Sequence, residues 1–502
     1  MINKLNRFIP DGYTPFESSH DYKNHERKLI DEKDVNNEIK YLNSMEDTFK
    51  ALNIKDGMTL SFHHHLRNGD YVQNMVSEEI LKENIKDIHY APSAIFPSNA
   101  ILSDLIINGN VTKIDTNYLN GPVAKTIGQG HLKGMLVMNT HGGRPRKIES
   151  GELLIDVAFV ACPVVDKSGN GYGGIGEAAC GSLGYAISDV KYAKKVVLVT
   201  DTIVEKLDKV EIENKYVDIV LVVDKIGDPK GIVSGTTKIT KDPVGLKIAS
   251  LTSKLLDELE MIKDGMSMQT GAGGTSLAVA SYVKDIMIKK NIKGSFASGG
   301  ITGYFVSMYE QGLFERLMDV QCFDIDAVKS FNNNQNHIGM SASKYANPYD
   351  EPVVNGLDFV ILGATEIDLN FNVNVVTDSY GRVMGGSGGH SDTAHGANIS
   401  IITTNLIKSR MPIIKDQVTT ITTPGEDIDV LVTERGIAIN PKRTDLLEKL
   451  KNSKLPIFTI EELYNLSHKI TGTPKKLELS KEVIGVVEYR DGTVIDTLYK
   501  FD

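Results

Sequence analysis

Continuous apolar runs alternate with amphipathic segments along most of the chain. The run LLIDVAFVACPVV at residues 153–165 is rich in β-branched side chains and shows no polar alternation. Such a run is typical of a strand that is buried on both faces of a parallel sheet. The alternation as a whole predicts an α/β protein with open parallel sheets. Further strands are predicted at 193–201, 216–224, 357–369 and 397–405, and helices at 275–290 and 305–317.

A short repeat divides the chain into two parts. The pentapeptide IKDGM occurs at residues 54–58 and again at 262–266, each time after a helix-like segment and before an apolar run. The shared context predicts two related halves. We expect a polar N-terminal extension over residues 1–50 that wraps another surface, a first α/β domain over 51–245 and a second over 246–502. The second is expected to end in a small appendage, the hairpin-like IGVVEYRDGTVIDTLYKF with Asp-Gly at its turn.

Composition narrows the class of protein. The chain has 502 residues, which exceeds the roughly 250 to 300 residues that one hydrophobic core organises. Its formal net charge of −10 is spread along the chain, so no basic face for nucleic acid is expected. No run of 18 apolar residues and no apolar leader is present, so neither a membrane span nor a signal peptide is expected. Three cysteines without paired spacing favour a reducing compartment, and we expect a cytoplasmic protein.

Two glycine-rich segments are candidates for ligand contact. GAGGTS at 271–276 precedes a predicted helix and resembles a phosphate-cradling loop, which makes Gly271, Gly273, Gly274 and Thr275 candidates for binding a cofactor. A tight connection between a strand and a helix would have the same sequence. The second segment, GGSGGHSDTAHGAN at 385–398, holds two histidines and an aspartate between two predicted strands.

The segment SFHHHLRNGD at 61–70 carries three consecutive histidines. Because side chains alternate along a strand, His63 and His65 are predicted to share a face while His64 points away. We expect His63, His65 and Arg67 to meet a small polyanion at the end of a strand. Histidines that cap an exposed strand end remain an alternative. A divalent metal site built from these histidines and the loop 385–398 is a further hypothesis, although no recognised zinc spacing accompanies them.

Glu366 directly follows the apolar run at 357–363. It is therefore predicted at the carboxyl end of a buried strand, where ligands of open α/β sheets bind. A carboxylate in such a place is costly without a partner or a role, but an ordinary solvated strand end would have the same pattern.

Five motifs occur in order across the second half, and together they resemble the coenzyme A transferase superfamily. The first half adds matching segments at 61–70, 140–174 and 189–201, and the whole pattern is similar to that of citrate lyase alpha subunits. The five motifs are GAGGTSLAVASYV, SGGITGYFVSMYEQGLF, GATEIDLNFNVN, GGSGGHSDTAHGAN and VTERGIAINPKRTDLL.

The resemblance implies an activity and its partners. Citrate would displace acetate from an acetyl thioester on an acyl carrier protein, the gamma subunit, whose prosthetic group derives from dephospho-coenzyme A. A beta subunit would then cleave the citryl thioester to oxaloacetate and regenerate the acetyl thioester. An oligomeric complex is expected, with no cofactor bound tightly to this chain, and coenzyme A thioesters would serve as analogues of the carrier. A free-standing acyl-coenzyme A:carboxylate transferase with a covalent glutamyl thioester is the alternative, and a non-catalytic scaffold for the carrier is another.

The resemblance also implies roles for single residues. Glu366 matches the glutamate of members that form a covalent thioester, so its replacement is expected to abolish exchange. Gly388 and Gly389 match the loop whose amides stabilise an oxyanion. This chain departs from the covalent members, since it lacks the proline after the first glycine loop and the aspartate-phenylalanine pair in the second. The carboxylates of citrate would need cationic partners, for which the candidates are Arg67, Arg144, Arg146 and Arg382, helped by His390 or His395.

Overall fold

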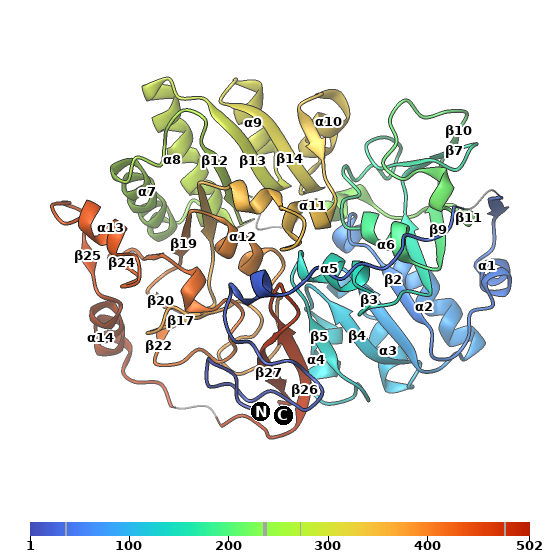
Figure 1. Ribbon diagram of the computed structural model, residues 1–502, viewed down its shortest axis with the longest axis horizontal. Coiled ribbons are helices and arrows are strands. Elements are labelled where there is room, and N and C mark those ends of the chain that lie inside the picture. Colours follow the sequence, from blue (N-terminus) through green and yellow to red (C-terminus); the bar gives the residue numbers. More distant parts are fainter. Residues whose placement is uncertain (36–37, 234–237, 272, 476–477, 502) are drawn as a thin grey trace.

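Two large open sheets, each built mainly from one half of the chain, form the body of the molecule (Figure 1). The computed structural model describes residues 1–35, 38–233, 238–271, 273–475 and 478–501. The predicted class, α/β with parallel open sheets, is confirmed. In Figure 1 the first half, coloured blue to green, lies on the right, and most of the second half, coloured green to red, lies on the left.

The first sheet has ten strands in the order β1-β11-β9-β6-β2-β3-β4-β5-β26-β27. Every neighbouring pair is parallel except β26 with β27. The strands are β1 (Lys40–Leu42), β2 (Thr59–Phe62), β3 (Ile88–Pro92), β4 (Val111–Thr116), β5 (Leu136–Met138), β6 (Val157–Ala161), β9 (Lys195–Thr200), β11 (Ile219–Val222), β26 (Val483–Glu488) and β27 (Val494–Tyr499). The helices of this half are α1 (Met45–Leu52), α2 (Val72–Glu83), α3 (Leu102–Ile107), α4 (Pro122–Gly128), α5 (Gly143–Glu149) and α6 (Ile187–Tyr192).

The second sheet has nine strands in the order β15-β14-β13-β12-β16-β19-β23-β24-β25, of which only β23 and β24 pair antiparallel. Its strands are β12 (Ser267–Thr270), β13 (Gly294–Ile301), β14 (Phe314–Cys322), β15 (His337–Gly339), β16 (Phe359–Leu362), β19 (Ile399–Thr403), β23 (Val430–Val432), β24 (Ile437–Ile439) and β25 (Ile457–Phe458). The helices are α7 (Pro243–Glu258), α8 (Gly274–Lys290), α9 (Gly303–Glu310), α10 (Ile325–Asn333), α11 (Ala342–Ala346), α12 (His390–Gly396), α13 (Thr444–Lys449) and α14 (Ile460–Thr471).

The two halves repeat one topology, as the IKDGM repeat predicts. The orders β11-β9-β6-β2-β3-β4-β5 and β23-β19-β16-β12-β13-β14-β15 correspond strand for strand, and each repeat precedes the matching strand, β2 or β12. Each half also carries a small three-stranded sheet. These are β10 (Ile203–Val204) with β7 (Val164–Asp166) and β8 (Gly171–Tyr172), and β18 (Val373–Asn374) with β17 (Glu366–Asp368) and β22 (Ile414–Lys415). A two-stranded ribbon joins β20 (Ile407–Lys408) to β21 (Met411–Pro412).

Matching aspartates show how closely the halves agree. Asp156 accepts a hydrogen bond from the amide of Thr59 at 2.8 Å, and Asp358 accepts one from the amide of Ser267 at 2.8 Å. Asp166 stabilises the turn after β7, and Asp368 stabilises the turn after β17. In each case the carboxylate accepts hydrogen bonds from the backbone amides two and four residues later. The repetition extends from the strand order to single hydrogen bonds.

The ends of the chain depart from the expected division. Strand β26 pairs with β5, so the C-terminal hairpin belongs to the first sheet and not to the second domain, as the red strands beside β5 in Figure 1 show. Helix α7 begins at Pro243 with Asp242 as its cap, slightly before the expected boundary at 245. The N-terminal extension contacts both halves, since Asn3 binds the backbone of Val494 and Tyr22 lies against His395.

One predicted helix is partly wrong. Residues 305–317 were expected to be a single helix, but α9 ends at Glu310 and β14 begins at Phe314. Gly312, with φ of 76°, turns the chain between them. The apolar residues after this glycine therefore enter the sheet instead of extending the helix.

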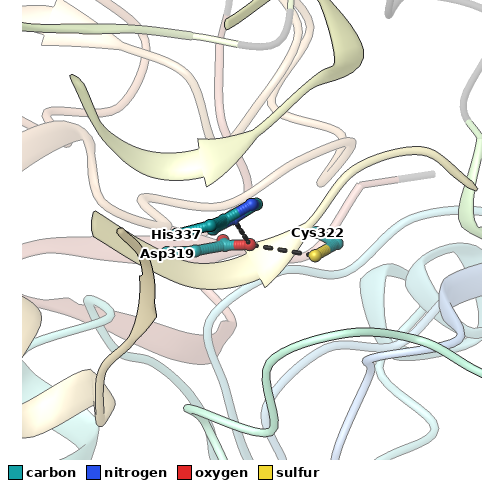
Figure 2. A group of neighbouring side chains, drawn as sticks. All are labelled: Asp319, Cys322 and His337. Carbon is teal, nitrogen blue, oxygen red and sulfur yellow. Dashed lines mark hydrogen bonds and ion pairs between the residues drawn. The ribbon is translucent and has the colours of Figure 1, made fainter. Parts of the chain in front are cut away.

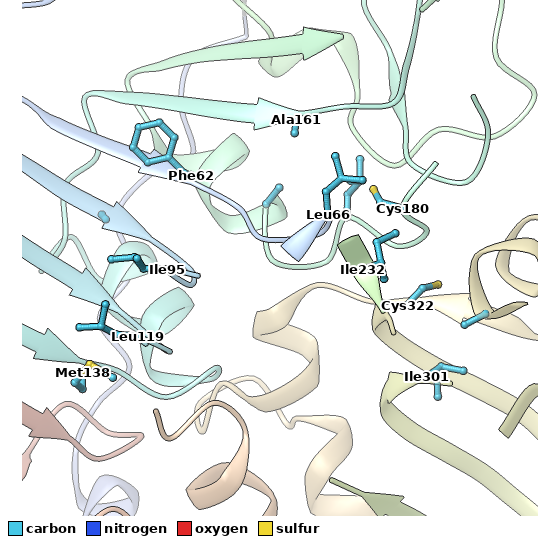
Figure 3. Close-up of a cluster of buried hydrophobic side chains, with 14 of the residues drawn as sticks. Phe62, Leu66, Ile95, Leu119, Met138, Ala161, Cys180, Ile232, Ile301 and Cys322 are labelled. Atoms are coloured by element: carbon cyan, nitrogen blue, oxygen red, sulfur yellow. The ribbon is translucent and has the colours of Figure 1, made fainter. Parts of the chain in front are cut away.

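One apolar core runs through both halves. Figure 3 shows strand-end side chains of the first sheet, such as Phe62 and Met138, in the same cluster as Ile301 of β13. Cys180 and Cys322, from opposite halves, both belong to it, and all three cysteines are buried thiols. Within the described residues, no helix combines the length and the apolar character needed to span a bilayer.

Candidate active site

Three histidines follow the end of β2 and are buried. Both ring nitrogens of His63 and of His65 have no hydrogen-bond partner among the described residues. Burial lowers the pKa of His63 to about 4 and holds the pKa of His65 well below its usual value. Near neutral pH, both rings are therefore neutral and offer one N–H donor each.

The predicted alternation of these histidines is wrong for His64, which does not point away from the other two. Strand β2 ends at Phe62, so the rule of alternating faces does not apply to the residues after it. The ring centroids of His63 and His65 are 6.0 Å apart, and those of His64 and His65 are 6.4 Å apart. All three rings gather on one side, at the carboxyl end of the first sheet.

A stack of rings extends this group towards the second half. The ring of His64 lies 4.6 Å from Tyr185, and Tyr185 lies 4.6 Å from His141. His64 Nδ1 is also 2.6 Å from Ser93 Oγ, at the end of β3. Burial lowers the pKa of His141 to about 3, and its Nδ1 has no described partner. The sequence analysis did not single out His141 or Tyr185, although His141 follows the apolar run that became β5.

The glycine loop of the second half lies directly on these rings. The amide of His141 donates to the carbonyl of Gly388 at 2.7 Å, and a Cβ at Gly388 would lie 3.3 Å from His141 Nε2. At Gly386 a Cβ would lie 2.0 Å from the carbonyl oxygen of Asn117, which no side chain can accommodate. The loop is rich in glycine because its backbone packs against the backbone of the first half.

The two predicted oxyanion donors differ in what their amides do. The amide of Gly388 donates to the carbonyl of Asn117 at 3.3 Å, a long hydrogen bond. Gly389 precedes α12, and its amide has no hydrogen-bond acceptor among the described residues. Gly389 is therefore the better placed of the two to donate to a ligand.

A chain of contacts leads from Gly389 to other residues of the second half. A Cβ on Gly389 would lie 2.6 Å from the hydroxyl oxygen of Tyr345 in α11. That hydroxyl accepts a hydrogen bond from Gln269 Nε2 at 2.7 Å. Gln269 in turn packs on Gly299, and a Cβ on the next residue, Gly300, would strike the ring of Phe323 at 2.2 Å.

Arg67 is the next residue in this chain of contacts. Its guanidinium carbon lies 4.9 Å from the centre of the Phe323 ring. Within the part of the chain that the structure describes, Arg67 has no carboxylate partner, and its Nη1 is buried without an acceptor. Its φ of 52° is unusual for a residue other than glycine, and such strain concentrates at functional sites. We call the group of residues His63, His65, Arg67, His141, Tyr345 and Gly389 the interdomain site.

The other candidate arginines have different surroundings. Arg144 forms a bidentate pair with Asp189 at 2.6 and 2.8 Å, and Asp189 also lies 4.0 Å from His63 Nε2. Arg144 therefore contacts the interdomain site through Asp189. Arg146 binds both oxygens of Glu152 at 2.8 Å. Arg382 is exposed and stacks on Tyr380. Of the four predicted arginines, only Arg67 belongs to the interdomain site.

His390 and His395 are engaged by the protein itself. His390 Nδ1 is 2.8 Å from Thr423 Oγ1, and its Nε2 is 2.9 Å from the carbonyl of Gly363. His395 Nδ1 is 3.0 Å from Asp427 Oδ1, and its Nε2 is 3.4 Å from the hydroxyl of Tyr22. Both residues therefore hold α12 in place, and neither has a ring nitrogen left for a substrate.

Glu366 lies at the start of β17 and is 1% exposed. Its Oε2 accepts hydrogen bonds from the amide of Thr419 at 2.8 Å and from Asn374 at 3.1 Å, and its Oε1 lies 3.8 Å from Lys415 Nζ. It lines a cleft of about 320 Å³ together with Lys415 and Arg7, and no residue of the interdomain site lines this cleft. In the first half, the matching position is the buried Val164, two residues before Asp166.

The first glycine loop begins near the interdomain site, two residues after Gln269. The amide of Gly271 donates to the carbonyl of Ile361, and the carbonyl of Gly274 accepts from Thr240. Thr275 Oγ1 would lie 3.0 Å from a Cβ on Gly245. A Cβ on Gly273 would meet nothing within 4 Å, so open space adjoins this residue. Ala272 lies outside the described residues.

A cluster of possible metal ligands lies elsewhere. Among the described residues, the side chains within mutual reach of one ion are Asp319, Cys322 and His337, not the histidines after β2. Figure 2 shows that Asp319 already binds both neighbours: Cys322 Sγ is 2.9 Å and His337 Nε2 is 3.0 Å from Asp319 Oδ2. The three groups therefore satisfy one another without an ion.

The fold defines an α/β protein with two related halves, each built on a large open and mostly parallel sheet. The chain belongs to the citrate lyase alpha subunit family, since residues 38–501 match the family model described as citrate lyase, alpha subunit (CitF). It is 45% identical to the citrate lyase alpha chain of Haemophilus influenzae over 463 residues, 92% of this chain and 93% of that one. The corresponding chain of Klebsiella pneumoniae is 40% identical over 500 residues, 98% of this chain and 96% of that one.

Solved structures agree. The crystal structure described as the putative alpha subunit of citrate lyase from Streptococcus mutans, in complex with citrate, superposes with a TM-score of 0.95 at 42% identity and covers 100% of both chains. A Pseudomonas malonate decarboxylase hetero-tetramer in complex with malonate matches with a TM-score of 0.63 at 16% identity, over 88% of this chain and 95% of that one, which is a likeness of fold alone.

Proposed function

We propose that this chain transfers the thiol of an acyl carrier from an acetyl group to citrate, which gives a citryl thioester and free acetate. The observation that carries the proposal is the likeness, over the whole chain, to a citrate lyase alpha subunit whose structure holds citrate. The interdomain site supports it, because buried and unpartnered donors beside an unpaired arginine suit a ligand with several carboxylates.

The reaction balances without a cofactor on this chain. A carboxylate oxygen of citrate attacks the carbonyl carbon of the acetyl thioester, and the resulting tetrahedral oxyanion collapses as the C–S bond breaks. The products of this step are an acetyl-citryl anhydride and a thiolate. The thiolate then attacks the citryl carbonyl carbon, the C–O bond of the anhydride breaks, and acetate leaves.

Each part of the interdomain site has a role in this scheme. Arg67 pairs with a carboxylate of citrate that does not react, and its planar guanidinium suits bidentate binding. The neutral rings of His63 and His65 donate further hydrogen bonds to the same ligand. The amide of Gly389 donates to the oxyanion, which in other enzymes contributes about 3 to 4 kcal/mol. The open space at Gly273 adjoins the proposed path of the thioester arm.

Partners follow from the same proposal. The thioester is carried by an acyl carrier protein, the gamma subunit, on a group derived from dephospho-coenzyme A, and the citryl product is cleaved by a beta subunit. The three free, buried thiols support a reducing compartment, so we place the reaction in the cytoplasm.

Exchange of acetate for citrate on the thioester tests the proposal. The assembled complex is loaded with radiolabelled acetyl thioester and given citrate, citramalate or buffer. We expect release of labelled acetate that depends on citrate and matches the citryl thioester formed. Release without any dependence on a carboxylate would contradict the proposal, and binding of the carrier without exchange would favour a scaffold instead.

A further inference from the structure

A tyrosine hydroxyl stands beside the oxyanion donor. Tyr345 is 2% exposed, and its hydroxyl accepts a hydrogen bond from Gln269 Nε2 at 2.7 Å. Burial raises the pKa of Tyr345, so the hydroxyl keeps its proton at physiological pH. Among the described residues, no acceptor takes this proton. The hydroxyl is therefore a charge-neutral donor with an unused hydrogen.

The position of this hydrogen-bond donor is set by two elements of the second half. Gln269 comes from the central strand β12, and Tyr345 comes from α11, which packs against α5 of the first half. At Gly389 a Cβ would lie 2.6 Å from the hydroxyl oxygen and 3.4 Å from two ring carbons. Only glycine at position 389 lets the hydroxyl approach the backbone whose amide is unpartnered.

We propose that Tyr345 is a further catalytic residue, whose hydroxyl and the Gly389 amide together donate to the oxyanion of the tetrahedral intermediate. This inference rests on the proposed function and deepens it. When citrate oxygen adds to the acetyl carbonyl, the carbonyl π electrons move to oxygen, and both donors hydrogen-bond the resulting oxyanion without losing their protons. When the C–S bond breaks, the electrons return to the carbonyl and both hydrogen bonds weaken.

The chemistry of the surroundings favours a donor here over an acid. Proton transfer from Tyr345 would leave a buried phenolate, and the nearby carboxylate of Asp392 disfavours that charge. The side chain of Gln269 orients the hydroxyl by donating to its oxygen, which leaves only the O–H to point at a ligand.

The test compares Tyr345→Phe with Tyr349→Phe in the complete complex. Tyr349 is a matched control, because it lies at the surface cleft around Arg146 and outside the interdomain site. We expect Tyr345→Phe to lower kcat for acetyl exchange about 100-fold, in the range found for loss of one oxyanion donor. Its KM for citrate should stay within about twofold of the wild type, because the donor acts on a charge absent from the ground state. Tyr349→Phe should leave both constants unchanged.

Three other outcomes would overturn the inference. A kcat of Tyr345→Phe within threefold of the wild type would remove the hydroxyl from the mechanism. An equal loss in kcat and in citrate affinity would make Tyr345 a substrate-binding residue instead. A wild-type complex without citrate-dependent exchange would refute the proposed function itself, and with it the role of Tyr345. If Tyr345→Phe does not assemble, Gln269→Leu keeps the hydroxyl but frees its orientation, and an unchanged kcat in that variant would count against the inference.

Discussion

The carboxylate of Asp392 accepts a hydrogen bond from the amide of Gly142 at 2.9 Å, across the boundary between the two halves. Asp392 lies in α12, just after the glycine loop, and Gly142 is the neighbour of His141. The same carboxylate accepts from Thr140 Oγ1 at 3.0 Å and lies 3.5 Å from Arg490 Nε. One buried acid therefore fixes the loop of the second half against the histidine of the first.

Close packing at this boundary predicts a contrast between two glycines. Gly386→Ala should destabilise the protein by at least about 2 kcal/mol, because its Cβ would lie 2.0 Å from the backbone oxygen of Asn117. Gly273→Ala has open space around its Cβ and an ordinary φ of −75°, so its unfolding free energy should fall by less than about 1 kcal/mol, the cost of alanine at the N-cap of α8. Urea denaturation of both variants measures the difference. An equal loss of stability in both would contradict the packing role of the second glycine loop.

Gly273→Ala also tests the predicted cofactor contact. If the thioester arm passes this loop, the added methyl group should raise the KM for the carrier thioester, while the KM for citrate stays constant. Steady-state kinetics with each substrate varied in turn separates the two constants. An unchanged KM for the thioester would place the arm elsewhere.

Arg67→Lys should weaken citrate binding. A lysine keeps the positive charge but loses the bidentate geometry, so we expect the KM for citrate to rise about 10- to 100-fold. Arg382→Lys is the matched control, because Arg382 is exposed and stacked on Tyr380, away from the interdomain site. Calorimetric titration of citrate checks both. Equal affinity in the wild type and Arg67→Lys would exclude the pairing with substrate.

Glu366→Gln should retain exchange within about threefold of the wild type. The carboxylate accepts hydrogen bonds from Thr419 and Asn374 and lines a cleft that the interdomain site does not share, so an acyl group on it has no support in this geometry. This outcome differs from the loss of activity expected from the resemblance alone. Hydroxylamine trapping after addition of acyl-coenzyme A is the direct measurement. A labelled Glu366, or complete loss of exchange in a folded Glu366→Gln protein, would restore the covalent mechanism.

The buried histidines predict a loss of stability in mild acid. In the folded protein the pKa of His63 is about 4, with burial as the main cause; Asp189 raises it and Arg144 lowers it. The unfolded chain, with a histidine pKa near 6.5, binds more protons below that pH. The stability from His63 is therefore complete above pH 6.5 and is lost as the pH falls towards 4, by about 3 kcal/mol.

Unfolding curves between pH 7.5 and 4 measure this slope, and His63→Asn should flatten it. His25→Asn is the control, because His25 lies on the surface of the N-terminal extension. A slope that is the same in all three proteins would place the acid sensitivity in other groups.

The fold class, the two related halves and the expected family follow from the sequence, because each depends on local pattern. Strands buried on both faces must be continuously apolar, and the IKDGM repeat stands before the same strand of each half. The sequence also marks His63, His65 and Arg67 as candidates, because they follow a predicted strand, and the resemblance adds Gly388 and Gly389 as candidates.

Only the tertiary structure decided which of these residues meet. Sequence separates His141, Tyr185 and Tyr345 from one another and from His63, and no periodicity relates loops that belong to different sheets. Whether an arginine is free depends on partners such as Asp189 and Glu152, which approach Arg144 and Arg146 only after folding. The C-terminal hairpin joins the first sheet for the same reason. Strands β26 and β5 pair although they are far apart in the sequence, and local sequence does not predict such a pairing.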